Sequence, residues 1–336
     1  MTTEITRREW LAGTSAVASS LMLSNAASSQ DMSSMINMGA PISKDNPIRY
    51  TNNENPYGIN PKAMKVILEA YKKAHLYNFT IRGELTDLIA GIEGLPPECV
   101  AVGAGSGEFL MASGALCGIM GGDVIVPHPT FATITRSASA LGANIIQVPV
   151  EEDLSISLNS MRKAITDKTT CLYLCNPNNP IPSIIEKTEL EQFCLELSKK
   201  YLIIIDEAYF EYVRDDSYST MAQLVKDNPN IVVLRTASKI HGFANVRIGF
   251  AFSHPDTLQK LRAFRSNTTS YPAIMGAITS YQDKEYQKFV IDKNYESLEI
   301  LYNMFEELEM QYVKAHANFV YANAGRDAQE VRSKLL

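Results

Sequence analysis

The sequence predicts an α/β fold in which a mostly parallel sheet carries helices on both faces. Between about residues 80 and 265, short apolar runs alternate with longer segments of helical periodicity, the pattern of repeated βαβ units. Two of these runs, residues 202–205 and 231–234, are four apolar residues long, as expected for strands buried on both faces of a parallel sheet. Because 336 residues exceed what one hydrophobic core comfortably organises, we expect two domains.

Residues 1–30 have the three parts of a signal peptide. Arg7 and Arg8 precede a mildly apolar stretch at residues 11–23, and small residues suited to cleavage follow at 24–27. The paired arginine is typical of twin-arginine signals, which direct folded proteins across the bacterial inner membrane. We therefore expect a periplasmic protein; the alternative is a leader on a cytoplasmic protein.

The segments outside the alternating region also have recognisable patterns. Several prolines limit helix formation in residues 31–60, which we expect to be an extended arm. Residues 61–75 predict a helix, because their apolar side chains share one helical face. Long helices are expected over residues 272–310, followed by a strand at 318–322 and a final helix from Asp327.

A glycine-rich turn follows the first strand of the alternating region. Residues 99–102 favour this strand, and Gly103-Ala-Gly105-Ser106-Gly107-Glu108 leads from it into an apolar helix at 109–116. In such a turn, backbone N–H groups and the helix dipole face an anion. The rival interpretation is a dinucleotide site, but Glu108 stands where the third glycine of that fingerprint belongs, and no ribose-binding acid follows the next strand. We therefore expect a phosphate group here.

Lys239 follows another predicted strand and is the strongest candidate for chemistry. It comes shortly after residues 231–234, with Thr236 and Ser238 before it and Arg247 eight residues later. A lysine beside a buried strand is costly to desolvate, so its pKa falls and its amine becomes nucleophilic. Two cations, two hydroxyls and backbone amides suit a phosphate beside an aldehyde. This combination describes pyridoxal 5'-phosphate (PLP), held on lysine as a Schiff base.

Polar and aromatic residues after three other strands suit the ring of PLP. Asp206 follows the run at 202–205, where ligands of parallel sheets bind, and its carboxylate could keep a pyridine nitrogen protonated. Tyr209 and Asn179 could donate hydrogen bonds to a ring oxygen, and Phe131 could stack on a flat ring. Each residue alone also has a simpler explanation, as a helix cap, a turn residue or a core aromatic.

Together these stretches resemble the class I/II PLP-dependent aminotransferases of fold type I, most closely the histidinol-phosphate aminotransferase-like branch. The resemblance runs from about Pro47 to the end of the chain. It rests on the order and spacing of Asn53-Glu-Asn55-Pro-Tyr57-Gly, Gly103-Ala-Gly-Ser-Gly-Glu108, Pro129-Thr-Phe131, Asn176-Pro-Asn-Asn179-Pro, Asp206-Glu-Ala-Tyr209 and Ser238-Lys239 with Arg247. The resemblance implies a three-layer α/β/α large domain at 61–265 that binds PLP, and a smaller α+β domain at 266–336.

The resemblance also implies a role for each candidate residue. Lys239 is then the Schiff-base lysine and proton shuttle, Asp206 contacts the pyridinium nitrogen, and Tyr209 contacts the ring oxygen together with Asn179. Phe131 stacks over the ring. The residues implied to hold the phosphate are Gly105, Ser106, Gly107, Thr236, Ser238 and Arg247. Tyr57 reaches the phosphate of the neighbouring subunit, which implies a homodimer with shared active sites.

The expected activity is transfer of an amino group from an amino acid to a 2-keto acid. A β-lyase, decarboxylase or racemase on the same scaffold is the first alternative, because the outcome depends on which substrate bond lies perpendicular to the ring. A PLP-binding scaffold without turnover is the second. A phosphorylated biosynthetic intermediate stays in the cytoplasm, so for an exported enzyme we expect an ordinary or aromatic amino acid rather than histidinol phosphate.

Three features depart from the family pattern. Ile181 and Pro182 stand where the family commonly has Thr-Gly, and Phe131 replaces a frequent tyrosine. The family's last strand carries an arginine that clamps the substrate α-carboxylate, a task that suits a bidentate guanidinium. Arg326 and Arg332 lie too early in the pattern to match it. We therefore expect a small domain that is C-terminally truncated.

The bulk properties argue against several other classes of protein. The net charge is −6 and no basic run occurs, so nucleic acid is not an expected partner. No stretch approaches the roughly 20 apolar residues of a membrane span. The five histidines show no metal-ligand spacing, so no metal is expected. All five cysteines fall in apolar runs, and we expect no structural disulfide.

Overall fold

The computed structural model describes residues 51–266 and 268–335 of the chain. The predicted signal peptide and most of the predicted arm therefore lie outside the described residues. Among the described residues, 51–303 and 313–321 form one unit, and 304–312 and 322–335 belong to a second. Every candidate site residue lies in the first unit, which we call the large unit.

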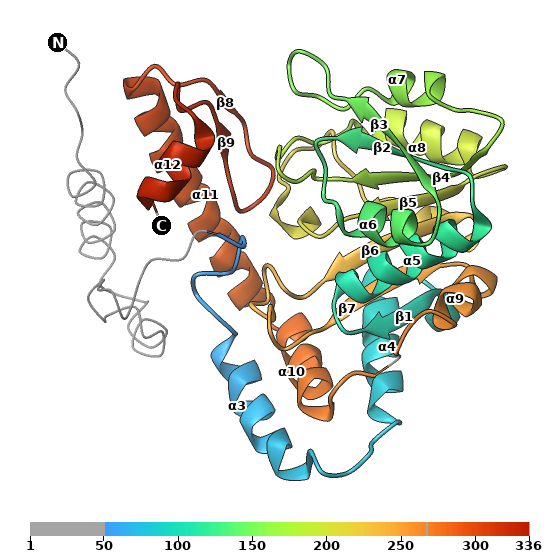
Figure 1. Cartoon of the computed structure of the whole chain (residues 1–336). Helices are drawn as coiled ribbons and strands as arrows, with labels where there is room; N and C mark the ends of the chain where they lie inside the picture. The colour runs from blue at the N-terminus through green and yellow to red at the C-terminus, as the bar shows by residue number, and fades with distance from the viewer. Residues whose placement is uncertain (1–50, 267, 336) are drawn as a thin grey trace. The chain divides into compact units, whose positions relative to one another are not determined.

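A seven-stranded sheet with the order β1-β7-β6-β5-β4-β2-β3 forms the centre of the large unit (Figure 1). The strands are β1 (Val100–Gly103), β2 (Asp123–His128), β3 (Asn144–Pro149), β4 (Thr169–Cys175), β5 (Leu202–Asp206), β6 (Ile231–Thr236) and β7 (Gly249–Ser253). Only β7 is antiparallel to its neighbours, β1 and β6; the other pairs are parallel. The mostly parallel sheet predicted from the sequence is confirmed.

Helices cover both faces of this sheet. One hydrophobic cluster joins the sheet to α5 (Ser106–Met120), α6 (Thr133–Ala140) and α9 (Pro255–Arg262). The other joins it to α3 (Pro61–Ala70), α4 (Ile81–Glu93), α7 (Leu158–Lys163), α8 (Lys187–Leu197) and α10 (Tyr271–Gln282). Along β5, Ile203 and Ile205 belong to the second cluster, whereas Leu202 and Ile204 belong to the first. The strand is thus buried on both faces, and the predicted three-layer α/β/α arrangement is confirmed.

The remaining elements connect or follow these layers. They are η1 (Tyr71–Lys73), η2 (Pro97–Cys99), η3 (Phe210–Tyr212), η4 (Ala222–Lys226), α11 (Lys284–Glu307), β8 (Tyr312–Val313), β9 (Tyr321–Ala322) and α12 (Ala328–Leu335). Asp327 caps α12, because its Oδ1 accepts hydrogen bonds from the N–H groups of residues 329 and 330. No described helix is long and apolar enough to cross a membrane.

Two predicted elements are shorter than expected. The helix predicted for 61–75 leaves α geometry after Ala70 and ends in the 3₁₀ turn η1, as helix ends often do. The strand predicted for 318–322 is confined to Tyr321–Ala322. Asn318 and Phe319 instead contact Asn53 and Tyr209 in the large unit, so they are engaged with the candidate site rather than with a strand partner.

Candidate cofactor site at the carboxyl edge of the sheet

The predicted site residues meet at one edge of the sheet. Gly105 follows β1, Phe131 follows β2, Asn179 follows β4, Asp206 ends β5 and Lys239 follows β6. In the parallel register, Asp206 lies opposite Cys175 on one side and Leu234 on the other. The carboxyl ends of these strands therefore open onto the same side, where ligands of such sheets bind.

Lys239 has a partly buried side chain whose amine donates hydrogen bonds to the backbone. Its Nζ donates to the carbonyl oxygens of Asn52 (2.9 Å) and Asn53 (3.3 Å). It also lies 5.3 Å from the centre of the Tyr209 ring. Burial lowers the pKa of Lys239 to about 8, although the nearby Asp206 carboxylate works in the opposite direction. Roughly a tenth of such amines are uncharged at pH 7 and can act as nucleophiles.

Asp206 is a buried carboxyl group with few hydrogen-bond donors. It is 2% exposed. Its Oδ1 accepts from the N–H of Ala208 at 3.2 Å, and the Tyr173 hydroxyl donates to Oδ2 at 3.5 Å. Burial raises the pKa of Asp206 to about 7. A buried carboxylate with few donors is stabilised strongly by a neighbouring cation. The surroundings of Asp206 therefore fit a protonated ring nitrogen.

The hydroxyl of Tyr209 joins three segments of the chain. It accepts hydrogen bonds from the side-chain amides of Asn53 (3.2 Å) and Asn179 (3.1 Å). Asn53 has φ of 53°, a left-handed conformation that asparagine tolerates. Its carbonyl oxygen also accepts from the amide of Asn318 (3.0 Å). Asn53 and Asn318 were not predicted as candidate site residues from the sequence. Asn53 belongs to the Asn-Glu-Asn-Pro motif, but the sequence alone did not indicate a role for it.

The turn after β1 forms a cradle with Arg247. Gly105 precedes α5 with φ of 84°, and a Cβ atom there would lie 2.0 Å from Nη2 of Arg247. The guanidinium donates to the carbonyl oxygen of Ala104 (3.0 Å) and to the Ser238 hydroxyl (3.2 Å). The Thr236 hydroxyl donates to that of Ser238 at 2.8 Å. A cation, two hydroxyls and the first N–H groups of a 15-residue helix thus converge, which fits a phosphate group.

Arg247 has a strained backbone, and its side chain points toward the start of α5. Its φ is 65°, which costs a residue other than glycine about 1–3 kcal/mol. Ser106 is buried at the start of α5, and Gly107 is the next residue of the helix. A Cβ built at Gly107 would lie 3.9 Å from Nη2 of Arg247. Such strain is common where a side chain must face a ligand.

Glu108, which stands where a dinucleotide fingerprint would have its third glycine, stabilises this turn. Its Oε2 accepts from the N–H of Ala104 (2.8 Å) and pairs with Arg265 (3.3 Å). Its Oε1 accepts from the Ser266 hydroxyl at 2.9 Å. The carboxylate occupies space that a side chain at Gly103 would need, since a Cβ there would lie 2.4 Å from Oε2.

Phe131 lies on an exposed loop, and Tyr57 packs against another aromatic ring. Phe131 is 40% exposed. Its loop is tied to that of Asn179, because the Thr130 hydroxyl donates to Asn178 Oδ1 at 2.8 Å. The ring of Tyr57 packs edge-on against Phe289 of the same chain at 5.0 Å. Ile181, which stands where the family commonly has threonine, is fully buried and adds an apolar side chain to the core.

The donor set around this edge suits PLP. Among residues 51–266 and 268–335, no group of three or more His, Cys, Asp or Glu side chains could hold a metal ion. The five cysteines are all buried and unpaired. The buried Asp206, the amine of Lys239 and the cradle at Gly105 match the ring nitrogen, the aldehyde and the phosphate of one molecule.

Comparisons with known proteins point to the same chemistry. The family model for aminotransferase class I and II matches residues 46–336. The histidinol-phosphate aminotransferase of Brevibacillus brevis is 32% identical over 295 residues, covering 86% of this chain and 79% of that protein. The aromatic amino acid aminotransferase of Cutibacterium acnes is 31% identical over 319 residues, covering 90% and 88%.

Two solved structures share the fold. A protein of Erwinia carotovora atroseptica assigned as a histidinol-phosphate aminotransferase has a TM-score of 0.83 and 26% identity, with 87% of this chain and 86% of that one covered. The histidinol-phosphate aminotransferase of Sinorhizobium meliloti, solved in complex with pyridoxal-5'-phosphate, has a TM-score of 0.76 and 23% identity, with 99% and 85% covered.

Proposed function

The chain belongs to the class I and II aminotransferases, and from this premise we propose how its own residues divide the work of amino-group transfer. It is a PLP-dependent enzyme of fold type I that moves an amino group between an amino acid and a 2-keto acid. The observation that carries the proposal is the position of a low-pKa amine, Lys239, beside the buried Asp206 on the same sheet edge as the Gly105–Arg247 cradle.

Each residue has a task that its contacts support. When bound, PLP supplies an aldehyde that takes up amino groups and a ring that withdraws electrons from the substrate α-carbon. Asp206 holds a proton at the ring nitrogen, and Tyr209 with Asn179 donates to the ring oxygen. Gly105, Ser106, Gly107, Thr236, Ser238 and Arg247 hold the phosphate. Lys239 would hold the aldehyde, and its free amine would move the proton at the substrate α-carbon.

A lysine variant tests this division directly. Wild-type protein reduced with borohydride after loading with PLP should carry one cofactor mass on Lys239, whereas Lys239→Ala should carry none. Lys260→Ala, at an exposed lysine of α9, is the matched control and should be labelled like the wild type. Wild-type protein that takes up no PLP, or a label that persists in Lys239→Ala, would refute the assignment.

An ordinary or aromatic amino acid is the proposed donor. The relative from Cutibacterium acnes is an aromatic amino acid aminotransferase and aligns over 319 residues. The predicted export separates the enzyme from phosphorylated intermediates of the cytoplasm. Single-turnover reaction of the PLP-loaded enzyme with a panel of amino acids, histidinol phosphate included, ranks the donors. Fastest conversion of histidinol phosphate would overturn this choice.

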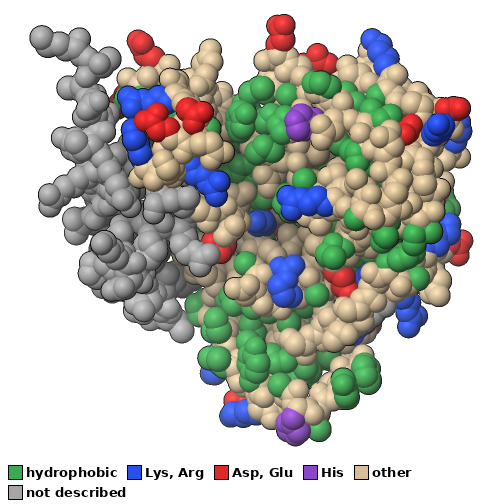
Figure 2. All heavy atoms as spheres, in the orientation of Figure 1, with side chains coloured by type: hydrophobic (Ala, Val, Ile, Leu, Met, Phe, Trp, Pro, Cys, Tyr) green, Lys and Arg blue, Asp and Glu red, His purple; other side chains and the backbone are tan. Residues whose placement is uncertain are grey.

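A homodimer is proposed from an apolar surface on α3 and the residues after it. Large apolar side chains there are exposed: Met64, Leu68, Tyr71, Leu76, Tyr77 and Phe79. Leu68 is 62% and Tyr77 is 91% exposed, and the rings of Tyr77 and Phe79 stack at 5.5 Å. Figure 2 shows apolar side chains gathered where Figure 1 places α3. We call these six residues the α3 patch; a second copy of the chain is its proposed partner.

Export through a twin-arginine route is proposed from the leader at residues 1–30. This route carries folded proteins, so the enzyme can load its cofactor before export. The five buried, unpaired cysteines agree with folding in a reducing compartment, where thiols are not oxidised.

A further inference from the structure

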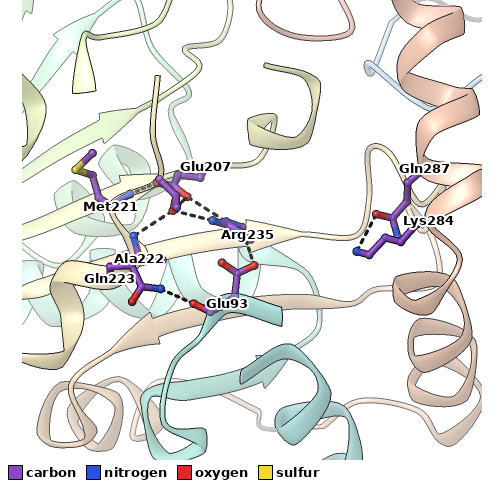
Figure 3. Close-up of polar contacts among 9 residues, drawn as sticks. Glu93, Glu207, Met221, Ala222, Gln223, Arg235, Lys284 and Gln287 are labelled. Carbon is purple, nitrogen blue, oxygen red and sulfur yellow. Dashed lines mark hydrogen bonds and ion pairs between the residues drawn. The ribbon is translucent and has the colours of Figure 1, made fainter. Parts of the chain in front are cut away.

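A buried ion cluster lies next to the two strands that carry the proposed cofactor contacts. The guanidinium of Arg235 on β6 bonds to Glu207 Oε2 through Nε (3.0 Å), to Glu93 Oε1 through Nη1 (2.6 Å) and to Thr220 Oγ1 through Nη2 (2.7 Å). Figure 3 shows Glu207 and Glu93 pointing toward Arg235 from separate elements. Arg235 and Glu207 are 3% and 1% exposed, so these bonds form away from water.

The same cluster joins several elements into one rigid group. Glu207 Oε2 also accepts from the Thr220 hydroxyl (2.7 Å), and its Oε1 accepts from the N–H of Met221 (2.8 Å). The guanidinium carbon of Arg235 lies 3.3 Å from the centre of the Phe210 ring. The cluster therefore fixes the end of α4, the end of β5, the segment before η4 and the end of β6 relative to one another.

The sheet register places this cluster behind the cofactor contacts. Asp206 pairs with Leu234, and the N–H of Glu207 donates to the Leu234 carbonyl oxygen at 2.8 Å. Successive side chains of a strand point to opposite faces. Asp206 and Thr236 therefore lie on one face, and their chain neighbours Glu207 and Arg235 form the ion pair on the other.

Stability alone does not account for this pair. Replacing a buried ion pair with apolar residues of similar volume often leaves stability unchanged, because desolvation offsets the attraction. The site has a stricter requirement. Asp206 and the Thr236–Ser238 hydroxyls must reach opposite ends of one rigid ligand, so a small shift of β5 against β6 would disrupt one set of contacts.

We propose that the Glu207–Arg235 ion pair is a positioning device that fixes the distance between Asp206 on β5 and the phosphate-binding hydroxyls after β6. Both residues act through the backbone of their strands and do not touch the cofactor. This inference rests on the roles proposed above for Asp206, Thr236 and Ser238.

The test compares three variants of the full-length chain. Glu207→Gln combined with Arg235→Met removes both charges at similar volume, and Arg235→Lys keeps the charge but loses the planar fork. Arg162→Met is the control, because Arg162 also pairs with a glutamate (Glu196, 3.0 Å) and lies 5.0 Å from the ring of Phe193, but belongs to α7 and not to a strand that leads to a candidate site residue. The readouts are the Kd for PLP, the visible circular dichroism of bound PLP and the Tm of the apoprotein.

A positioning role predicts a specific pattern in these readouts. The double variant should remain folded with a lowered apoprotein Tm, because Glu93 loses its cation, and it should bind PLP roughly tenfold more weakly or worse and lose most of the visible dichroism. Arg235→Lys should lie between the double variant and the wild type, and Arg162→Met should match the wild type.

Three outcomes would overturn the inference. One is wild-type PLP affinity and dichroism in the folded double variant. The second is an equal loss in Arg162→Met. The third is an unfolded apoprotein in the double variant when Arg235→Lys either binds PLP like the wild type or is unfolded too. In both cases the ion pair would have a purely structural role. Failure of the wild type to bind PLP would instead refute the proposed site itself.

Discussion

The hydroxyl of Tyr209 accepts a hydrogen bond from the side-chain amide of Asn179 at 3.1 Å, which joins the turns that follow β4 and β5. Asn53 donates to the same oxygen, so segments 30 and 156 residues away from Tyr209 meet at one atom. Burial raises the pKa of Tyr209 above its usual value. The hydroxyl therefore stays protonated at neutral pH and remains a donor for a ligand oxygen.

Replacement of Tyr209 by phenylalanine should impair catalysis without unfolding the protein. Two partly buried amides lose their acceptor, at a cost of up to about 1–3 kcal/mol for each group left unpaired, and the ligand loses a donor. We expect kcat/KM to fall by about ten- to a hundredfold. Tyr201→Phe, at a buried tyrosine outside the site, controls for loss of a hydroxyl. Equal kcat/KM for wild type and Tyr209→Phe would show that this oxygen has no part in catalysis.

The Gly105 position should tolerate no side chain. A Cβ atom there would lie 2.0 Å from Arg247 Nη2, and φ of 84° is unfavourable for other residues. Gly105→Ala should therefore displace the guanidinium and weaken PLP binding by at least about tenfold, the equivalent of 1.4 kcal/mol. Titration of the apoprotein with PLP measures this change.

Gly121 offers a closely matched control for that substitution. It lies at the other end of α5, with φ of 70°, and apart from its chain neighbours no heavy atom in the described part of the chain lies within 4 Å of a Cβ built there. Gly121→Ala should lower the Tm through the same backbone strain but leave the Kd for PLP unchanged. Similar losses of PLP affinity in both alanine variants would mean that strain in α5, rather than the Gly105–Arg247 contact, explains the effect.

Where the pattern was local, the sequence predicted the strands and named candidate residues that the structure brings to one edge of the sheet. The apolar runs identified β5 and β6, and the polar residues after them identified Asp206 and Lys239. Contacts between distant segments were not predictable, because no local pattern records that Asn318 meets Asn53. The role of Arg235 was also not predicted, because a charged residue at a strand end is ordinarily solvated. Arg235 is instead 3% exposed and paired with carboxylates that are distant in the sequence.

The α3 patch should control the oligomeric state. Leu68→Lys with Tyr77→Ser puts a charge and a hydroxyl into an apolar contact, where an unpaired charge is costly. Light scattering after size exclusion should give a dimer for the wild type and a monomer for the double variant. Leu141→Lys, at a residue of comparable exposure after α6, should remain dimeric. A wild type of monomeric mass would eliminate the proposed homodimer.

The leader should determine where the enzyme accumulates. In a bacterial host with a twin-arginine pathway, Arg7→Lys with Arg8→Lys should leave the protein in the cytoplasm at its uncleaved mass. Arg49→Lys, outside residues 1–30, should not alter localisation. Fractionation followed by mass spectrometry measures both properties. Periplasmic recovery of the double variant at wild-type levels would argue against this route.

Glu211 in η3 should make stability fall with rising pH. Its Oε2 is buried and has no hydrogen-bond partner among the described residues, and burial raises its pKa from 4.5 to about 8. The carboxyl groups of Glu93 and Glu207 raise it further, and Arg235 lowers it. Between these pH values the folded protein holds a proton that the unfolded chain has released. Its contribution to stability is therefore complete below pH 4.5 and is lost as the pH rises to about 8, with a slope of at most about 1.4 kcal/mol per pH unit.

Glu211→Gln abolishes the titration of this side chain and leaves a neutral group of similar shape. The gain in Tm over the wild type should be small at pH 5 and should grow steadily to pH 8, as measured by thermal unfolding of the apoprotein at several pH values. Glu152→Gln, at an exposed glutamate, should give a difference that does not change with pH. A constant difference between Glu211→Gln and the wild type from pH 5 to pH 8 would mean that Glu211 is ionised throughout this range and that Arg235 compensates its burial.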